Sequence, residues 1–449
     1  MIRKLTRNTG VLHGTLPFIA VLTVMIALVA LAQTIGTGKV SGKDRFGDQL
    51  TNSGSPLFVP AVAYDSGGYT ATSVAVGDVN GDGKLDLVVG NRCADTGCQS
   101  GHGSVGVMLG KGDGTFRAAV AYDSGGDPNF TFDEGVAIAD LNGDHKPDIV
   151  VTNACGSFKC SYNGTVGVLL GNGDGTFQPA VIYPSGGSYP ASVAVADVNG
   201  DGRPDLLVTN ACGDPNCDGT VGVLLGNGNG TFNAPVTYSS DGTLPKSIVV
   251  ADVNHDGKPD LIVANLQSHD VGVLLGNGNG TFQTAISYDS GGSDASSVAV
   301  ADINGDGTID LLVCHTGQNT VGVLIGKGDG TFQPAVNYSS DPGSTSGAAV
   351  SVGVADMNGD AKPDLLVVNS SLGGNGNNGG AVAVLLGNGD GTFQAAVNYA
   401  SGGYQALALA VADVNGDGTQ DVLLANSCSF NSSACGGPVN ETRAWWGCF

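Results

Sequence analysis

The sequence predicts an all-β, seven-bladed β-propeller built of four-stranded blades. An acidic loop of the form Asp-x-Asn-x-Asp-x-x-x-Asp occurs seven times. Short apolar or alternating runs, typical of strands, separate one copy from the next. Consecutive copies begin 62, 57, 55, 50, 54 and 57 residues apart. A period of this length carrying four short strands is typical of a propeller blade.

Each repeat unit contains the same segments in the same order. In the third unit, residues 192–196 alternate before the acidic loop, 206–208 form a continuous apolar run, and 221–226 form a third strand-like run. A Gly-rich turn then leads to a Phe-x-x-Ala/Pro-Val/Ile-x-Tyr strand. We name these strands A to D. Antiparallel order places the A–B acidic loops and the C–D turns on one face, and the B–C loops and D–A connections on the other.

The two ends of the repeat region favour a closed ring over a solenoid. A Phe-x-x-Ala-Val-x-Tyr strand stands alone at 58–64, and the last unit stops after its third strand, near 444–447. We therefore expect the N-terminal strand to complete the last blade, which removes a free sheet edge. The expected propeller domain is 57–449.

The first 56 residues differ from the repeats. Arg3, Lys4 and Arg7 precede an uncharged apolar run at 16–32, which ends in small residues. This pattern predicts a signal peptide at 1–32, with an uncleaved membrane anchor as the alternative. Residues 33–56 are expected to be a linker. The sequence thus predicts a monomeric protein that is secreted or held at the cell surface or in the periplasm, touching a membrane only through its N-terminal segment.

Charge restricts the partners. The net charge of the 449 residues is −23, and 21 of the 41 acidic residues lie in the seven loops. Because no basic stripe is present to neutralise phosphates, we expect no nucleic-acid partner. Three Asp within nine residues repel one another. Their clustering therefore indicates cation binding.

The acidic loops are predicted to bind up to seven calcium ions. Calcium takes six to eight oxygen ligands, which positions 1, 3, 5 and 9 and the carbonyl of position 7 can supply. An EF-hand would need Glu at position 12, where the first copy has Val89, and magnesium demands a tighter octahedron. The predicted ligands are Asp78, Asn80, Asp82, Asp86, Asp140, Asn142, Asp144, Asp148, Asp197, Asn199, Asp201, Asp205, Asp252, Asn254, Asp256, Asp260, Asp302, Asn304, Asp306, Asp310, Asp356, Asn358, Asp360, Asp364, Asp413, Asn415, Asp417 and Asp421.

Position 6 of the loop is Gly in five copies, where a sharp turn needs positive φ. The exceptions are His145 in the second copy and Ala361 in the sixth. Since Ala does not take this conformation cheaply, the sixth site is expected to be the weakest.

Eight cysteines form four close pairs. Local disulfides in an oxidising compartment are expected, because the spacing and the scarcity of nearby His do not suit a zinc site. The expected disulfides join Cys93 with Cys98, Cys155 with Cys160, Cys212 with Cys217, and Cys428 with Cys435. Cys314 ends an apolar run and is expected to be a buried thiol, and Cys448 is left over.

The acidic loop, the Leu-Leu-Gly-Asn-Gly-Asp-Gly-Thr-Phe motif and the Ala-Val-x-Tyr strand together resemble the FG-GAP/VCBS repeats, the family of the N-terminal propeller of integrin α chains. The resemblance covers about 57–447. It implies a seven-bladed propeller with calcium in the A–B loops. It also implies adhesion or ligand recognition on the face opposite the metals.

All four cysteine pairs fall in predicted B–C loops of neighbouring blades, at 92–104, 154–165, 211–219 and 427–442. Stapling lowers the entropy cost of ordering a recognition loop, so these loops are expected to bind an extracellular protein or polysaccharide. Protection against proteolysis would explain the staples equally well.

An enzyme is not expected, because no Ser-His-Asp or Cys-His order and no Gly-x-Ser-x-Gly is present. A hydrolase or lyase would have to draw on acids outside the loops, such as Asp95, Asp133, Glu134, Asp214 and Glu441. A structural cell-surface component is the remaining alternative.

Overall fold

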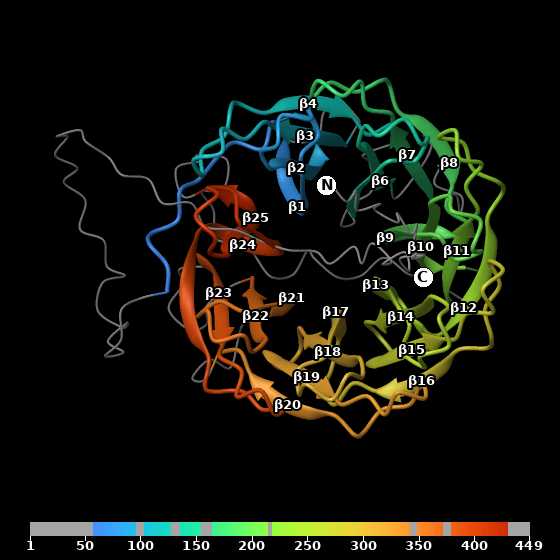
Figure 1. Ribbon diagram of the computed structural model, residues 1–449, viewed down its shortest axis with the longest axis vertical. Coiled ribbons are helices and arrows are strands. Elements are labelled where there is room, and N and C mark those ends of the chain that lie inside the picture. The colour runs from blue at the N-terminus through green and yellow to red at the C-terminus, as the bar shows by residue number, and fades with distance from the viewer. Residues whose placement is uncertain are drawn as a thin grey trace, which may run out of the picture.

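The fold is a ring of β-sheets. The computed structural model describes residues 57–95, 103–126, 135–153, 164–213, 218–341, 348–370 and 379–429. The signal peptide and linker expected at 1–56 lie outside these ranges. Within them every regular element is a β-strand, and the strands form six sheets. Figure 1 shows the sheets standing around a central axis, with β1, β9, β13 and β17 innermost and β4, β8, β16 and β20 on the outside. None of the described segments is a helix that could span a membrane.

The first three sheets follow the chain. The first contains β1 (Tyr69–Gly77), β2 (Asp86–Cys93), β3 (Ser104–Met108) and β4 (Val120–Asp123). The second contains β5 (Val136–Ala139), β6 (Asp148–Asn153), β7 (Thr165–Leu169) and β8 (Val181–Pro184). The third contains β9 (Ser188–Ala196), β10 (Asp205–Cys212), β11 (Asp218–Leu224) and β12 (Val236–Thr243).

The other three sheets continue this order. The fourth contains β13 (Pro245–Ala251), β14 (Asp260–Asn265), β15 (Asp270–Leu274) and β16 (Ile286–Asp289). The fifth contains β17 (Ala295–Ala301), β18 (Asp310–His315), β19 (Thr320–Leu324) and β20 (Val336–Ser339). The sixth contains β21 (Ala349–Ala355), β22 (Asp364–Asn369), β23 (Gly379–Leu385), β24 (Val397–Ala412) and β25 (Asp421–Ser429).

Burial follows the position of each strand in its sheet. All paired strands are antiparallel, and the second strand of a sheet is buried along its length, as in β10. Such strands have neighbours on both faces, which explains their continuous apolar sequence. The outermost strands are mostly exposed, with a single half-buried position at the third residue, as in β4 and β16. Their first residues, including Val120 and Ile286, are more than half exposed.

Six hydrophobic clusters hold neighbouring sheets together. Each joins two adjacent sheets; for example, Ile262 and Val273 of the fourth sheet pack with Val298 and Leu311 of the fifth. One cluster joins the last sheet to the first and thereby closes the ring. The apolar cores therefore lie between sheets rather than along the central axis.

Aromatic pairs repeat around the outside of the ring. The Tyr of one outer strand meets the Phe of the next repeat edge to face, as in Tyr183–Phe232, with ring centroids 5.4 Å apart. Phe58 and Tyr64 of the N-terminal segment take part in the same way. Phe58 contacts Tyr399 of the last sheet, and Tyr64 contacts Phe116 of the first. The N-terminal segment thus bridges the last and first sheets.

The expected seven blades are a wrong prediction, because the described strands form six sheets. Strand β24 runs for 16 residues without a break. Its first half pairs with β23 and its second half with β25. The seventh hairpin is therefore joined to the sixth sheet, which becomes five-stranded. The expected closing strand is also wrong: residues 58–64 lie at the seam but belong to none of the described strands.

Candidate metal-binding loops

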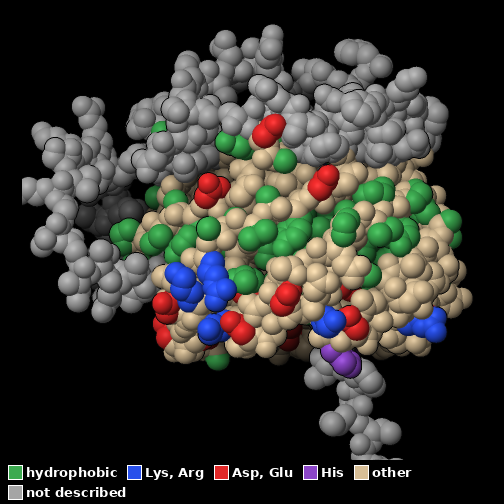
Figure 2. Space-filling view, turned by 90° about the horizontal axis from the view of Figure 1, so that it is seen from above, with side chains coloured by type: hydrophobic (Ala, Val, Ile, Leu, Met, Phe, Trp, Pro, Cys, Tyr) green, Lys and Arg blue, Asp and Glu red, His purple; other side chains and the backbone are tan. Residues whose placement is uncertain are grey.

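The seven acidic loops lie at one rim of the ring. Each follows the first strand of its repeat and precedes the second, as residues 78–86 lie between β1 and β2. In the side view of Figure 2, acidic, basic and His side chains gather along this rim, below a band of apolar side chains. The predicted A–B position of the loops is confirmed for all seven.

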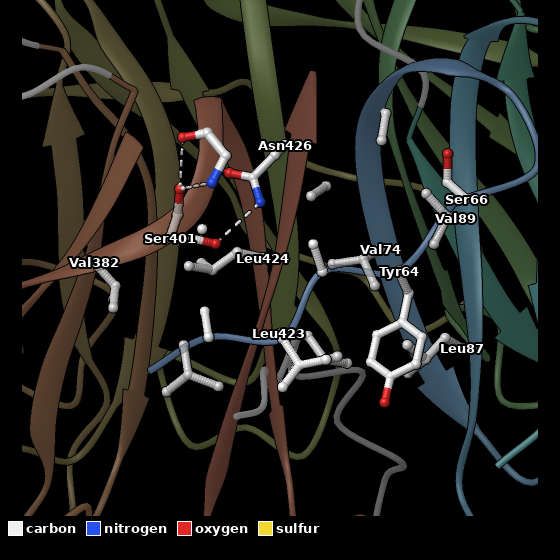
Figure 3. Close-up of a pocket in the computed structure, with 18 of the residues that line it drawn as sticks. Tyr64, Ser66, Val74, Leu87, Val89, Val382, Ser401, Leu423, Leu424 and Asn426 are labelled. Atoms are coloured by element: carbon white, nitrogen blue, oxygen red, sulfur yellow. Dashed lines mark hydrogen bonds between the residues drawn. The ribbon is translucent and has the colours of Figure 1, made fainter. Parts of the chain in front are cut away.

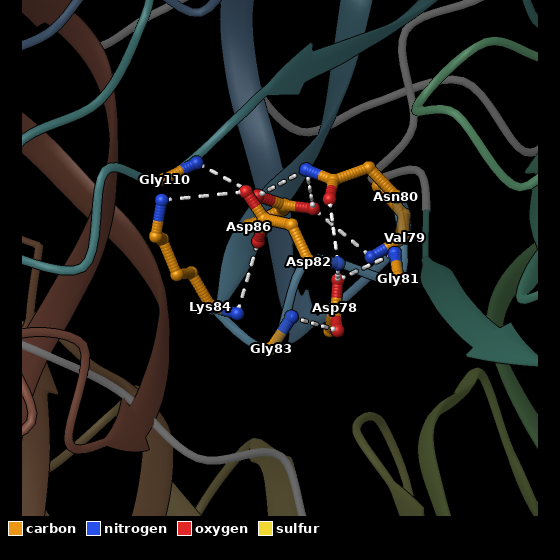
Figure 4. Close-up of polar contacts among 9 residues, drawn as sticks. All are labelled: Asp78, Val79, Asn80, Gly81, Asp82, Gly83, Lys84, Asp86 and Gly110. Carbon is orange, nitrogen blue, oxygen red and sulfur yellow. Dashed lines mark hydrogen bonds and ion pairs between the residues drawn. The ribbon is translucent and has the colours of Figure 1, made fainter.

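The first loop shows how the acidic side chains are used (Figure 4). Asp78 accepts hydrogen bonds from the N–H groups of Gly81 and Gly83, both at 2.8 Å. Asn80 Oδ1 accepts from the N–H of Asp82 at 2.9 Å, and Asp82 Oδ1 accepts from the N–H of Lys84 at 3.0 Å. Positions 1, 3 and 5 therefore turn inward and fold the loop around their own oxygen atoms. In the other six loops the N–H of position 6 likewise donates to position 1, and the N–H of position 7 donates to position 5.

Position 9 has a role that was not predicted. Asp205 is fully buried; its Oδ2 accepts from the N–H of Val198 at 3.0 Å, and its Oδ1 accepts from the N–H of Gly226 at 2.7 Å. Gly226 begins the C–D turn, so the carboxylate ties the acidic loop to that turn. The equivalent bond to a C–D turn is made by Asp86, Asp148, Asp260, Asp310 and Asp364.

Burial raises the pKa of these position-9 carboxyls. Desolvation is the largest cause, and the negative charges at positions 1 and 5 add to it. The pKa of Asp86, Asp148, Asp205, Asp260 and Asp421 is raised to about 6. Each loop thus concentrates negative charge against a buried carboxyl. A bound cation would relieve this repulsion.

The side-chain oxygens of the acidic loops are of the kind that bind a hard cation, but in this structure they are not arranged around a common centre. Positions 1, 3, 5 and 9 offer only carboxylate and amide oxygens, the ligands that calcium takes. A carboxylate has about four lone-pair positions, so the hydrogen bonds within the loop leave some of them for a metal. Among the described residues, however, no three acidic, His or Cys side chains are grouped closely enough to hold a metal ion. The loops fit calcium through their donors, and the ligand assignment stays a prediction.

The turn at positions 4 and 6 requires left-handed backbone. Gly202 at position 6 of the third loop has φ +79°, and an added Cβ would meet nothing within 4 Å. His145 and Ala361 occupy the same position with φ of +63° and +64°. The two exceptions therefore keep the conformation of the other loops. Ala361 donates the usual N–H to Asp356 at 2.7 Å.

On the opposite face, a Ser–Asn pair ties six of the seven D–A connections to the following repeat, through a hydrogen bond from the Asn amide to the Ser carbonyl. Ser185 Oγ donates to Asn210 Oδ1 at 2.6 Å, and the Asn amide donates to the Ser carbonyl at 3.2 Å. Sequence reasoning missed these pairs, although the signal is regular: the Ser follows the Tyr of each Phe-x-x-Ala/Pro-Val/Ile-x-Tyr motif by two residues, and an Asn follows six of the seven position-9 Asp residues by five.

The fifth sheet replaces this Asn by His315. Its Nε2 lies 3.1 Å from Ser290 Oγ, and its Nδ1 lies 3.0 Å from Thr320 Oγ1. Ser290 and His315 are both fully buried. Burial lowers the pKa of His315 to about 4, so the ring is neutral near pH 7. The pair occupies the place of a structural Ser–Asn pair and is closed to a substrate.

Two of the expected disulfides are covered in part by the described residues. Cys93 and Cys212 are disulfide-bonded, whereas their expected partners, Cys98 and Cys217, lie outside the described ranges. Cys314 is a free, fully buried thiol, as expected, and burial raises its pKa.

The other two expected disulfides stay predictions. The bond expected between Cys155 and Cys160 is not shown, because Cys155 lies outside the described ranges and so does Cys160. Cys428 belongs to β25, but its expected partner Cys435 lies outside these ranges, as does Cys448. The stapling of the second and last B–C loops is therefore untested.

A cavity of about 150 Å³ lies at the seam of the ring, between the N-terminal segment and β25 (Figure 3). Apolar side chains such as Val74, Leu87 and Leu424 contribute much of its lining. Among the polar groups drawn, Asn426 donates to the carbonyl of Ser401, and the Ser401 hydroxyl donates to the carbonyl of Gly403.

The comparisons with known proteins identify the class to which this ring of repeats belongs. A family model described as an FG-GAP-like repeat matches residues 93–151, 157–208, 211–263, 252–313, 306–367 and 371–424, and a second FG-GAP repeat model matches 70–105. These matches cover most of the chain. The protein belongs to the FG-GAP-like repeat family.

Two curated relatives share part of this sequence. Phosphatidylinositol-glycan-specific phospholipase D of Bos taurus is 32% identical over 174 residues, which is 35% of this chain and 20% of that protein. Integrin alpha-V of Gallus gallus is 30% identical over 239 residues, which is 49% of this chain and 22% of that protein. The matched parts span about a fifth of the length of these relatives. Proteins that share these repeats therefore include both an integrin and a phospholipase.

One solved structure supports the propeller fold. A putative 6-phosphogluconolactonase from Bacteroides uniformis superposes with a TM-score of 0.50 and 16% identity, covering 73% of this chain and 86% of that chain. At this identity the likeness shows the fold alone.

Proposed function

We propose that the protein is an extracytoplasmic, calcium-binding recognition module. Its acidic rim would bind calcium, and its opposite face would bind an extracellular protein or a polysaccharide. The observation that carries this proposal is the contrast between the two faces of the ring. One face repeats the same acidic loop in every unit, whereas the connections on the other face differ from unit to unit.

The connections between second and third strands show this variation. In the fourth sheet only four residues separate β14 from β15, and the fifth sheet has a turn of the same length between β18 and β19. In the first sheet β2 ends at Cys93 and β3 begins at Ser104; in the second, β6 ends at Asn153 and β7 begins at Thr165. A rigid scaffold with loops of varied length on one face is a common design for recognition.

The calcium half of the proposal rests on the loop chemistry. Each acidic loop carries four Asp or Asn side chains with oxygen donors within nine residues. The negative charges at positions 1 and 5 lie near the buried carboxyl of position 9. Calcium bound to the folded state would stabilise it by mass action. We expect calcium to raise the melting temperature by several degrees and a chelator to reverse the effect. Differential scanning calorimetry with excess calcium or with EDTA tests this. An unchanged transition, together with no heat of binding in calorimetric titration, would contradict it.

The recognition half requires a screen followed by matched variants. Protein and glycan arrays, probed with and without chelator, would identify the ligand class. A variant with Cys93→Ser and Cys98→Ser should then lose partner binding but keep calcium binding. Gln267→Ala in the short turn of the fourth sheet is the matched control and should keep both. If the cysteine variant binds the partner as well as the parent protein does, the first-sheet loop is not part of the recognition surface.

A further inference from the structure

Position 7 divides the acidic loops into two groups. Five loops carry a basic residue there, and its nitrogen lies close to the position-5 carboxylate of the same loop. The distances are 3.5 Å for Lys84–Asp82, 3.5 Å for Lys146–Asp144, 3.9 Å for Arg203–Asp201, 2.9 Å for Lys258–Asp256 and 4.0 Å for Lys362–Asp360. The other two loops have Thr308 and Thr419 at this position.

The basic side chain is held across the loop by the neighbouring turn. A Cβ added at Gly278 of the C–D turn would lie 2.9 Å from Lys258 Cδ, so the lysine stem lies directly against this glycine. The arrangement recurs with the lysines or arginine of the other four loops. Packing of the stem thus places the positive charge beside position 5, rather than leaving it free in solvent.

The threonine loops replace this charge by a hydroxyl group. Thr308 Oγ1 donates to Asp306 Oδ1 at 2.6 Å, and Thr419 Oγ1 donates to Asp417 Oδ1 at 2.5 Å. Each threonine loop therefore has a formal charge of −3, and each basic loop a formal charge of −2. In the part of the chain that the structure describes, Asp306 and Asp417 form no ion pair with Lys or Arg.

We propose that the residue at position 7 sets the calcium affinity of each loop, so that the rim contains two classes of site. Loops 302–310 and 413–421 are the tight sites, and the five loops with Lys or Arg are weaker. This inference rests on the proposed calcium binding. The physical cause is that a fixed positive charge competes with a divalent cation for the same carboxylates. By Coulomb's law at a partly solvated site, its effect on affinity is on the order of tenfold.

A histidine of the neighbouring repeat lies near one of the threonine loops. His255, at position 4 of the fourth loop, interacts electrostatically with Asp306. The other six loops have Gly at that position. The variant His255→Gly therefore provides a background in which loop 302–310 can be compared without this neighbour.

Calorimetric titration of the metal-free protein with calcium alone tests the proposal by counting sites. The parent protein is expected to show two tight sites, followed by weaker sites with about tenfold lower affinity. Thr308→Lys, made in the His255→Gly background because the His255 ring lies beside Gly328, should remove one tight site. Lys258→Thr should add one.

A lysine elsewhere on the same rim is the matched control. Lys327 lies on a C–D turn, and Lys327→Thr removes the same charge without removing an ion pair to position 5. We expect it to leave the number of tight sites unchanged. If Lys327→Thr has the same effect as Lys258→Thr, net charge rather than position 7 governs affinity and the proposal is overturned.

The remaining outcomes separate this inference from the proposed function. Absence of any calcium binding by the parent protein would refute the proposed calcium function itself. Binding with a single class of equivalent sites, unchanged by Thr308→Lys and Lys258→Thr, would refute only the two-class proposal. Circular dichroism of each variant in chelator confirms that the fold is intact, so a lost site cannot be attributed to unfolding.

Discussion

Ala361 is the residue at which the loop conformation is most costly. Its φ is +64°, in the left-handed region, and five of the other loops have Gly at this position. A left-handed conformation costs about 1 to 2 kcal/mol for a residue with a Cβ. Ala361→Gly should therefore raise the free energy of unfolding by about 1 kcal/mol in chelator, measured by chemical denaturation.

The reciprocal change provides the control for this prediction. Gly202 has the same conformation in the third loop, with open space where a Cβ would lie. Gly202→Ala should destabilise the protein by about 1 kcal/mol through backbone strain alone. Stability that is unchanged by both substitutions would show that the loop relaxes to another conformation.

His315 should make stability depend on pH. Burial lowers its pKa to about 4 in the folded state, below the ordinary value of 6.5. Between these values the unfolded chain binds the extra proton, so this contribution to stability is complete above pH 6.5 and is lost as pH falls towards 4. The loss is on the order of 2 kcal/mol. Denaturant unfolding at about pH 7 and about pH 5 measures it.

His315→Asn is the matched variant, since it restores the residue that the other repeats have at this position. It should fold and should lose less stability than the parent over the same fall in pH. An identical loss in both proteins would assign the pH dependence to groups other than His315. The position-9 carboxyls would act in the opposite direction, because their raised pKa makes the folded state bind the extra proton as pH falls.

These residues also show what the sequence could predict. The four oxygen-bearing positions of each loop were found from their spacing. The dual hydrogen bonding of Asp205 was not, because its partner Gly226 lies 21 residues away and belongs to a different hairpin. The Ser–Asn pairs had a regular spacing in the sequence, yet only the structure shows that the two spacings bring the residues together.

At the scale of the element, the position-9 carboxylate joins two hairpins of one sheet. Asp205→Ala would leave the buried N–H groups of Val198 and Gly226 without their acceptor. A lost buried hydrogen bond of this kind costs about 1 to 3 kcal/mol. We expect the variant to be destabilised by about 3 kcal/mol and the amide of Gly226 to exchange faster with deuterium.

Asp201→Ala at the exposed position 5 is the control for this effect. In chelator it should cost less than about 1 kcal/mol, because its ion pair with Arg203 is long and solvated. If both variants were equally destabilised, the carboxylates would contribute through general loop folding rather than through the bridge from position 9 to the C–D turn.

The strands themselves were largely predictable from pattern. The alternating segments form the first strands, and the continuous apolar runs form the buried second strands. A strand buried on one face alternates apolar and polar residues, whereas a strand buried on both faces is apolar throughout, so the sequence pattern predicts each type. The number of sheets was not predictable in this way. Residues 400–404 resemble the other D–A connections, yet here they stay extended within β24. That outcome depends on pairing with β23 and β25, which no local pattern encodes.

At the scale of the whole molecule, the ring is closed at one seam. The cluster that joins the last sheet to the first includes Val74 and Leu87 on one side and Leu409 and Val411 on the other. Phe58 packs against the same cluster and against Tyr399, with ring centroids 4.8 Å apart. The N-terminal segment therefore covers the join.

Phe58→Ala should loosen this seam before the rest of the ring. Loss of a partly buried aromatic contact costs about 2 kcal/mol, so we expect a lower melting temperature. Hydrogen exchange should increase first in β1 and β25 and later in β13. Leu57→Ala, at a more exposed neighbouring position, is the control. Uniform acceleration across all sheets would mean that the seam does not open separately.

The position of the N-terminal segment has a mechanical consequence. Any pulling force transmitted along the chain from before Leu57 would reach the Phe58–Tyr399 contact before it reached a β-sheet. The contacts of Phe58 with Tyr399 and of Tyr64 with Phe116 would then break one after the other. The hydrogen bonds between strands would not yet bear the force. Under tension the ring would therefore open first at the seam between the last and first sheets, and the individual sheets would stay intact.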